Sequence, residues 1–306
     1  MTAGIFASDS SATTPFSATP YEGTGAGTAV VTGITQTISW HKRRENTGNH
    51  LLRYLAGSST FLSTNGGAAE AGLSPSVAVN YNSTGMTLDS GDNVAINSNG
   101  ALYASWAWRE NAGYFEEMQF TGTEPTPQTV SHTLGVEPAF MIFKVRQQSG
   151  GWWVYHQSLG ATKYLFLNSD AVPVTGSTAW NDTAPTSANF TVGNSTANYA
   201  GEEMLALLFA DSTGMAKFGN YTGTGATNSI ATGFRPKFII IKRTDSAGGW
   251  VMVDSARGGN KYFLANTNDA EATATLLTFG SNGFELTSSN ALTNASGGTY
   301  IYGAWA

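Results

Sequence analysis

The sequence contains no cysteine, few charged residues and no cluster of basic residues. Without cysteine the chain can form no disulfide bond, no thiolate nucleophile and no cysteine-based zinc site. Charged residues make up 12% of the chain, roughly half the usual share for soluble domains, so surface helices rich in Glu–Lys pairs are not expected. The formal net charge is −6, and without a basic patch we expect no nucleic-acid partner.

Long hydrophobic runs are missing as well. Residues 1–20 contain neither a basic segment nor an apolar one, so we expect no signal peptide there. No apolar stretch approaches the roughly 20 residues that a membrane-spanning helix needs, and no membrane insertion is expected. Hydrophobic residues nevertheless make up 41% of the chain and aromatic residues 12%, which suits packed cores and argues against disorder.

The chain contains an internal repeat. Residues 138–144 match residues 236–242, and at the same offset residues 150–152 match residues 248–250. A more divergent first copy shares its beginning and its end with the other two. Each copy opens with an aromatic residue before a Gly-Thr turn, at Tyr21, Phe120 and Tyr221, and closes with an aromatic or apolar strand, at residues 103–108, 204–209 and 300–305.

These matches predict an extended N-terminal arm, residues 1–20, followed by three units at residues 21–119, 120–220 and 221–306. In the third unit an apolar run at 238–242, a turn cluster at 245–249 and a second run at 250–254 predict a hairpin. Further strands are expected at 262–265, after the Asn-Gly turn at 282–283, and at 300–305. The predicted fold class is therefore all-β, with three tandem β-sandwich units of jelly-roll-like type.

One segment tests this prediction. Residues 202–210 (EEMLALLFA) have a high helix propensity. The matching segments of the other copies, 103–108 and 300–305, are aromatic and typical of strands. Because equivalent repeats should share one fold, we expect a strand there.

The best-preserved pattern lies in the third copy. It comprises Gly-Phe-Arg-Pro at 233–236, Lys242, Trp250, Asp-Ser-Ala-Arg-Gly at 254–258, Asn-Gly-Phe at 282–284 and a closing aromatic strand at 300–305. The second copy departs from it at 156–160, and the first lacks the proline. This pattern resembles a repeat module of tail and virion structural proteins of marine and cyanobacterial bacteriophages.

The resemblance implies a bacteriophage virion protein, made in the host cytoplasm and located in the tail or a surface appendage. The leading hypothesis is a short tail fibre or appendage component with an adhesive face for a host-surface glycan, assembled as a homo-oligomer, with a trimer favoured. The first alternative is a purely structural head decoration, collar or baseplate component. The second alternative is a polysaccharide-degrading tailspike.

Tryptophans are the candidate ligand-binding residues. Trp152 and Trp250 correspond to His50 in the first copy, so this position tolerates a polar side chain, and its face is expected to be partly exposed. The neighbouring position is apolar in every copy and is expected in the core. Trp180 lies in a predicted loop. Such indoles could stack on sugar rings, or could instead cover a sandwich edge or a subunit interface.

The remaining polar residues predict no catalytic, metal or cofactor site, and we expect no enzyme. Asp254 is expected to pair with Arg257 or to cap the following turn. The adjacent pairs Glu116-Glu117 and Glu202-Glu203 should point to opposite faces of their strands, which does not suit a glycosidase. Four scattered histidines lack metal-binding spacing, and the acidic segment 89–93 is expected to be a turn.

The N-terminal arm is expected to bind other virion proteins. It is too polar to form a core of its own, and in isolation it would be a loose tail. Ile5, Phe6 and Phe16 are the hydrophobic residues that could anchor it on a neighbouring subunit.

Overall fold

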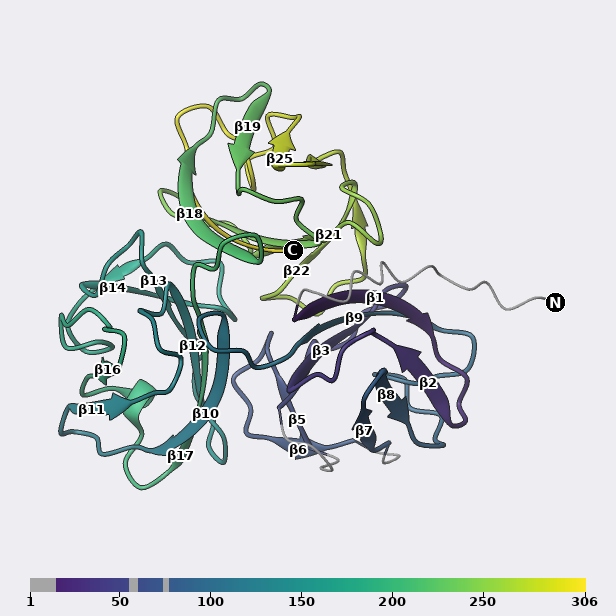
Figure 1. The fold of residues 1–306 in the computed structure, drawn as a ribbon, viewed down its shortest axis with the longest axis horizontal. Coiled ribbons are helices and arrows are strands. Elements are labelled where there is room, and N and C mark those ends of the chain that lie inside the picture. The colour runs from purple at the N-terminus through teal and green to yellow at the C-terminus, as the bar shows by residue number, and fades with distance from the viewer. Residues whose placement is uncertain (1–14, 55–59, 74–76) are drawn as a thin grey trace.

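The computed structural model describes residues 15–54, 60–73 and 77–306. These residues form three β units around a common centre (Figure 1), and each unit pairs a six-stranded antiparallel sheet with a smaller sheet of two or three strands. The predicted all-β sandwich fold is confirmed. In the part of the chain that is described, no helix is long and apolar enough to cross a membrane.

The first unit has a large sheet of order β1-β9-β3-β4-β5-β6 and a small sheet of order β2-β8-β7. Its strands are β1 Phe16–Glu22, β2 Thr28–Val31, β3 Ile38–Arg43, β4 Leu51–Arg53, β5 Thr60–Ser63, β6 Ala71–Gly72, β7 Val79–Asn82, β8 Gly85–Leu88 and β9 Leu102–Trp108.

The second unit repeats the large sheet with the order β10-β17-β12-β13-β14-β15, and its small sheet is the pair β11-β16. Its elements are β10 Phe115–Thr121, β11 Gln128–Ser131, β12 Phe140–Val145, β13 Trp153–His156, β14 Lys163–Phe166, β15 Val174–Thr175, β16 Asn189–Val192, the short 3₁₀ helix η1 Thr196–Asn198 and β17 Glu203–Phe209.

The third unit has the large-sheet order β18-β26-β20-β21-β22-β23 and the small-sheet order β19-β25-β24. Its strands are β18 Ala216–Thr222, β19 Asn228–Ala231, β20 Phe238–Arg243, β21 Val251–Asp254, β22 Lys261–Leu264, β23 Ala272–Thr273, β24 Leu277–Gly280, β25 Gly283–Leu286 and β26 Thr299–Trp305. The expected hairpin is the antiparallel pair β20–β21, and residues 203–209 form the expected strand β17.

The central strands of each large sheet are buried on both faces, which explains their nearly continuous apolar sequences. In β20, Ile239 faces the small sheet of its own unit, whereas Ile240 faces the centre of the molecule. Successive side chains of a strand point to opposite faces, so one strand supplies two cores. Each unit therefore has a sandwich core of its own and contributes to a central core that all three units share.

The central core lies where the last strands of the three units converge, close to the C-terminus (Figure 1). Trp108, Phe209 and Trp305 end the equivalent strands β9, β17 and β26. Their ring centroids lie 5.9 Å, 5.5 Å and 5.7 Å apart in the three pairings, so the three rings touch around one pseudo-threefold axis.

The first strand of each unit starts before the aromatic residue that opens the repeat in the sequence. In the first unit β1 begins at Phe16, so residues 16–20 are part of the sheet and not of a free arm. Phe16 is buried against Phe238 of the third unit, with ring centroids 5.8 Å apart. This corrects the expectation that Phe16 anchors the chain on a neighbouring subunit, because its ring is buried in the chain's own core. Ile5 and Phe6 lie outside the described residues.

Close backbone packing and a buried asparagine explain the Gly-Thr turn that opens each unit. A Cβ atom at Gly122 would lie 2.1 Å from the carbonyl oxygen of Tyr199, so only glycine permits this approach. The side chain of buried Asn198 accepts a hydrogen bond from the Thr123 amide at 2.9 Å and donates one to the Thr126 carbonyl at 2.9 Å. Asn97 and Asn294 make the equivalent contacts in the other units, so each turn is tied to the loop before the closing strand.

Candidate functional site

The four candidate ligand-binding residues are buried. His50 is 0% exposed, and Trp152, Trp180 and Trp250 are each 1% exposed. None of them is available to stack on a sugar ring, and the expected adhesive platform is therefore wrong at these positions. Trp180 packs between the two sheets of the second unit, where its indole donates a hydrogen bond to the Lys163 carbonyl at 3.0 Å.

The other three residues occupy the junctions between units. The indole of Trp152 donates to the carbonyls of Ser63 and Gly66 in the first unit, at 2.9 Å and 3.0 Å. The indole of Trp250 donates to the Phe166 carbonyl of the second unit at 3.0 Å. Each tryptophan thus reaches back to the preceding unit of the same chain, and this junction is neither the sandwich edge nor the subunit interface that the sequence left open as alternatives.

His50 closes the ring of units. Its ring packs edge-on against Phe263 of the third unit, with centroids 5.8 Å apart, and accepts a hydrogen bond from the Trp40 indole at 3.0 Å. A histidine fits where the other copies have tryptophan because Trp40 fills the remaining space from its own unit. The polar residue that suggested exposure in the sequence is thus a buried, hydrogen-bonded one.

A buried lysine lies beside each of these junctions. Lys42, Lys144 and Lys242 occupy equivalent places in β3, β12 and β20, and all three are 0% exposed. The match between Lys144 and Lys242 that the repeat predicted is confirmed.

Each lysine binds the unit before it. The Lys242 ammonium donates to the carbonyls of Asp170 in the second unit, Arg243 and Gly248, at 3.0, 3.0 and 2.8 Å. Lys144 reaches Gly67 of the first unit at 3.3 Å, and Lys42 reaches Asn268 of the third at 3.4 Å. Burial lowers the pKa of all three lysines to about 8.

Asp254 also acts at a junction. Its carboxylate accepts hydrogen bonds from the Arg257 side chain at 2.6 Å and from the Arg257 amide at 2.9 Å, which confirms both of the structural roles expected for this pair. The same carboxylate accepts from the Trp106 indole of the first unit at 2.9 Å. Arg44 and Glu271 add an ion pair at 2.9 Å across the same junction.

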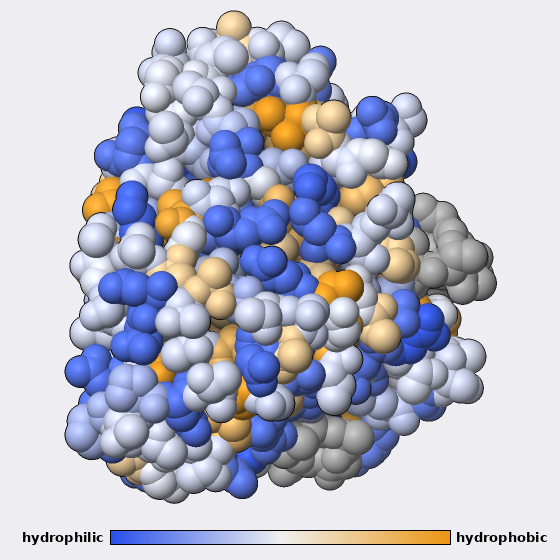
Figure 2. All heavy atoms as spheres, turned by 60° about the vertical axis from the view of Figure 1, so that its left-hand side comes forward, coloured by the Kyte–Doolittle hydropathy of each residue, from blue (hydrophilic) through white to orange (hydrophobic). Residues whose placement is uncertain are grey.

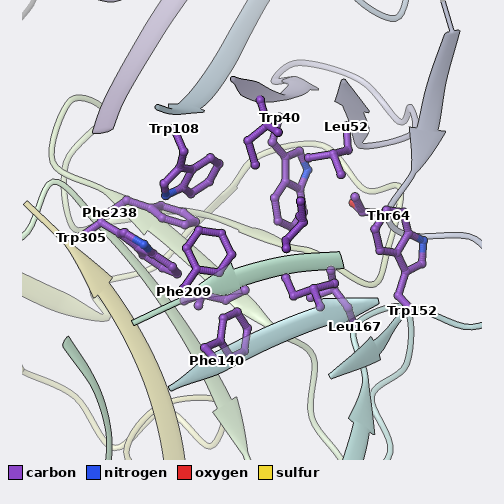
Figure 3. Close-up of a pocket in the computed structure, with 14 residues that line it drawn as sticks. Trp40, Leu52, Thr64, Trp108, Phe140, Trp152, Leu167, Phe209, Phe238 and Trp305 are labelled. Atoms are coloured by element: carbon purple, nitrogen blue, oxygen red, sulfur yellow. The ribbon is translucent and has the colours of Figure 1, made fainter. Parts of the chain in front are cut away.

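A small cavity lies in the central core (Figure 3). Its volume is about 20 Å³, which is room for roughly one water molecule. Equivalent residues of the three units line it, among them Trp108, Phe209 and Trp305, and nearly all of the lining is apolar. Such a space is a packing defect at the point where three sheets meet, and it cannot hold a substrate.

An open cleft of about 440 Å³ lies where the first unit passes into the second. Glu110, Glu116 and Glu117 line it, so the adjacent pair Glu116–Glu117 borders one cleft, contrary to the expectation that its members are kept apart on opposite faces. Glu116 accepts hydrogen bonds from the Thr133 amide and hydroxyl, at 2.9 Å and 2.8 Å. Burial, together with the nearby Glu110 carboxylate, raises the pKa of Glu117 to about 7, so this carboxyl can carry a proton near neutral pH.

A polar cluster inside the first unit escaped the sequence reasoning. Ser39, His41, Arg53 and Ser105 project into the space between its two sheets, and none is more than 1% exposed. The His41 Nε2 atom lies 2.8 Å from the Ser39 hydroxyl, which in turn lies 2.8 Å from the Tyr81 hydroxyl. Placing the divergent first copy on the other two, residue by residue, would have shown that these positions are apolar there.

Among the described residues no group of three His, Cys, Asp or Glu side chains is arranged to hold a metal ion. Comparison with curated proteins and comparison with solved structures both found no match to the chain. Residues 11–306 match the family described as a domain of unknown function, DUF7483. The match spans all three units, so the ring as a whole corresponds to one family domain, and the chain belongs to the DUF7483 family.

Proposed function

We propose that the chain is a structural protein of a bacteriophage virion, a component of a short tail fibre or another appendage. The observation that supports this best is the closed ring of three repeats around one aromatic core. A ring that buries lysines and aromatic residues at its junctions is a rigid block, suited to transmit load rather than to open and close. The sequence resemblance to virion repeat modules points to the same role.

Contact with the host surface would be made by polar loops. The face in Figure 2 is largely hydrophilic, with small and separate hydrophobic patches. The large hydrophobic side chains that stand exposed among the described residues are all valines: Val31, Val94, Val136, Val172 and Val174. Binding of a host glycan would therefore rest on hydrogen bonds from Asn, Ser and Thr side chains, each weak, and multiplied by the number of copies in the particle.

Burial of the tryptophans favours the alternative of a purely structural head decoration, collar or baseplate component. Immunoelectron microscopy of purified particles of the virus that encodes the chain separates the two, with an antibody raised against the recombinant protein. Label at the distal end of the tail supports adhesion, and label at the head or a tail joint supports scaffolding. Particles that contain none of the protein would refute the virion proposal altogether.

Assembly into a homotrimer through the N-terminal arm remains a proposal. Phe16 belongs to the core, so Ile5 and Phe6 are the hydrophobic residues left for contact with a neighbouring virion subunit. Removing residues 1–14 should leave the ring intact and convert the proposed trimer to a monomer in light scattering. An unchanged mass would show that the arm does not hold the subunits together.

The acidic cleft supports a second candidate function, polysaccharide degradation. Glycosidases use a carboxyl group that is protonated near neutral pH together with a second, ionised carboxylate. Glu117, whose pKa is about 7, lies beside other carboxyl groups in this cleft. Incubation with host polysaccharide should then release oligosaccharides, and Glu117→Gln should abolish the release while Glu285→Gln, outside the cleft, preserves it. Equal release by both variants, or none by the wild type, would exclude this activity for the cleft.

A further inference from the structure

The repeats provide an internal control for the polar cluster of the first unit. The four polar side chains lie next to one another on the inner face of the large sheet, because Ser39 pairs with Arg53 and His41 pairs with Ser105 in the strand register. The equivalent residues are Met141, Phe143, Tyr155 and Ala206 in the second unit and Ile239, Ile241, Val253 and Tyr302 in the third. The same sheet therefore folds without any of these four polar groups.

Among the described residues the Tyr81 side chain is the hydrogen-bonding group that acts on the Arg53 guanidinium. The Arg53 side chain is buried, and neither Nε nor the two terminal nitrogens make a hydrogen bond of good geometry. The group lies over the Tyr81 ring at 5.3 Å and the Phe61 ring at 6.0 Å. These aromatic faces attract the cation, but the Tyr81 hydroxyl alone cannot satisfy its five N–H donors.

A buried cation with unused donors is strongly unfavourable unless an acceptor supplies the missing bonds. The acidic side chain that acts on Arg53 is Asp89, which directly follows β8, is exposed, and accepts a hydrogen bond from the Asn80 side chain. Nothing in the fold requires a cation here, since Val253 fills the equivalent place in the third unit. Among the described residues no side chain supplies the missing acceptors, so an acceptor from outside the chain fits this place.

The surrounding groups suit an oxyanion. The planar guanidinium fork donates two parallel hydrogen bonds to a carboxylate or phosphate. The Ser105 hydroxyl is buried and also unpaired, so a further donor lies on the same face. His41 stays neutral, because burial and the nearby Arg53 charge lower its pKa to about 3, and its ring therefore adds no second charge.

We propose that the interior of the first unit binds a small oxyanion, held by the Arg53 guanidinium and the hydroxyls of Ser39 and Ser105. Carboxylate and phosphate share the required chemistry, a planar or tetrahedral set of oxygens with negative charge. The second and third units, which have apolar residues at these positions, bind none.

Thermal unfolding of the full-length protein in sodium phosphate, sodium acetate and sodium chloride at one ionic strength tests the proposal. Phosphate or acetate should raise the midpoint of the wild type by roughly 3–5 °C over chloride at saturation. Arg53→Leu should remove the shift, whereas Arg109→Leu, at an exposed position, should keep it. The same shift in Arg53→Leu, or no shift in the wild type, overturns the proposal.

A second measurement does not depend on the variant. A crystal structure of the wild-type protein grown in phosphate should show tetrahedral density against the Arg53 guanidinium and none in the other two units. Density for ordered water alone at that place would overturn the proposal even if Arg53→Leu failed to fold. Phosphate that raises the midpoint when acetate does not would identify the larger oxyanion as the ligand.

Discussion

At the scale of single residues, the junctions combine a long side chain with backbone carbonyls of the preceding unit. The ammonium of each buried lysine donates to the carbonyl at the end of its own strand and to a carbonyl of the preceding unit. Lysine suits this task because three donors leave one nitrogen in different directions. The same residue type in the same place of each unit makes the three junctions alike.

Lys242→Met should lower the free energy of unfolding by about 2 kcal/mol at pH 7, because three partly buried carbonyls lose their donor. Urea denaturation followed by tryptophan fluorescence measures the change. Lys163→Met is the control, since that side chain is exposed and should leave the midpoint unchanged. Equal midpoints for Lys242→Met and the wild type would show that water satisfies the carbonyls as well.

The same lysines predict how stability depends on alkaline pH. Their pKa is about 8 when folded and close to 10.5 when unfolded, so between these values the unfolded chain holds more protons. Stability should therefore rise from pH 8 to about pH 10, and the rise should be shallower in Lys242→Met. Above pH 10 it should fall, because burial raises the pKa of Tyr155 and Tyr302 to about 12 and the unfolded tyrosines ionise first.

His156 predicts a loss of stability in acid. Its Nε2–H donates to the Tyr302 carbonyl of the third unit at 3.1 Å, and its Nδ1 accepts from the Ser158 amide at 3.1 Å, so the folded site admits only the neutral ring. Burial lowers the pKa of His156 to about 4. Between pH 6.5 and 4 the unfolded state gains the proton first, and about 3 kcal/mol of stability should be lost.

His156→Gln removes the titrating group and should make this acid loss smaller. Urea unfolding at a series of pH values from 7 to 4.5 measures how steeply the free energy of unfolding falls with pH in the wild type and in His156→Gln. If the two proteins lose stability in parallel over this range, the acid sensitivity arises elsewhere, for example at His41 and His50, whose pKa values burial also lowers.

At the scale of elements, the sequence predicted the strands with a clear repeat partner. Glu203–Phe209 has a helical composition but forms β17, because its neighbours β10 and β12 supply hydrogen bonds on both sides and its two faces fill two cores. The match to the equivalent strands of the other units therefore predicted this segment correctly, whereas its helix propensity alone did not. The short strands β19 and β24 were missed, since their apolar residues are too few to show a period.

The candidate site was predicted less well, for a physical reason. A position that holds tryptophan twice and histidine once resembles a half-exposed face, yet it lies in a junction between units. Sequence patterns report whether a side chain meets apolar surroundings, and a junction lined by backbone carbonyls accepts both an indole and an imidazole. Only the closed ring shows which surface covers His50.

The turn asparagines give a prediction at this scale. Asn294→Ala removes one acceptor for the Thr224 amide and donors to the carbonyls of Ala226 and Ser288. We expect a loss of about 3 kcal/mol, since three backbone groups lose the hydrogen bonds that this buried side chain makes. Asn220→Ala, on an exposed face of β18, should cost much less. Comparable losses in the two variants, measured by urea denaturation, would contradict the role of Asn294 as the tie between turn and closing loop.

At the scale of the whole molecule, the three units share too much surface to be independent. Phe140 of the second unit packs on Phe218 of the third at 5.6 Å, and Phe16 of the first packs on Phe238 at 5.8 Å. Removing any one unit would expose aromatic rings of the other two to water. Because each unit is covered by both others, the ring should fold and unfold as one cooperative domain.

Hydrogen exchange can test this cooperativity through a residue far from the junctions. Phe284 lies in the sandwich core of the third unit, 2% exposed, and Phe284→Ala should cost about 3 kcal/mol. If the ring unfolds as a whole, the slowest amides of β9 and β17 in the other two units should exchange about a hundredfold faster, just as those of β26 do. Independent units would instead confine the acceleration to residues 216–306. That outcome would reduce the central core to a contact between three separate domains, and the rigid block on which the virion proposal rests would no longer follow from the fold.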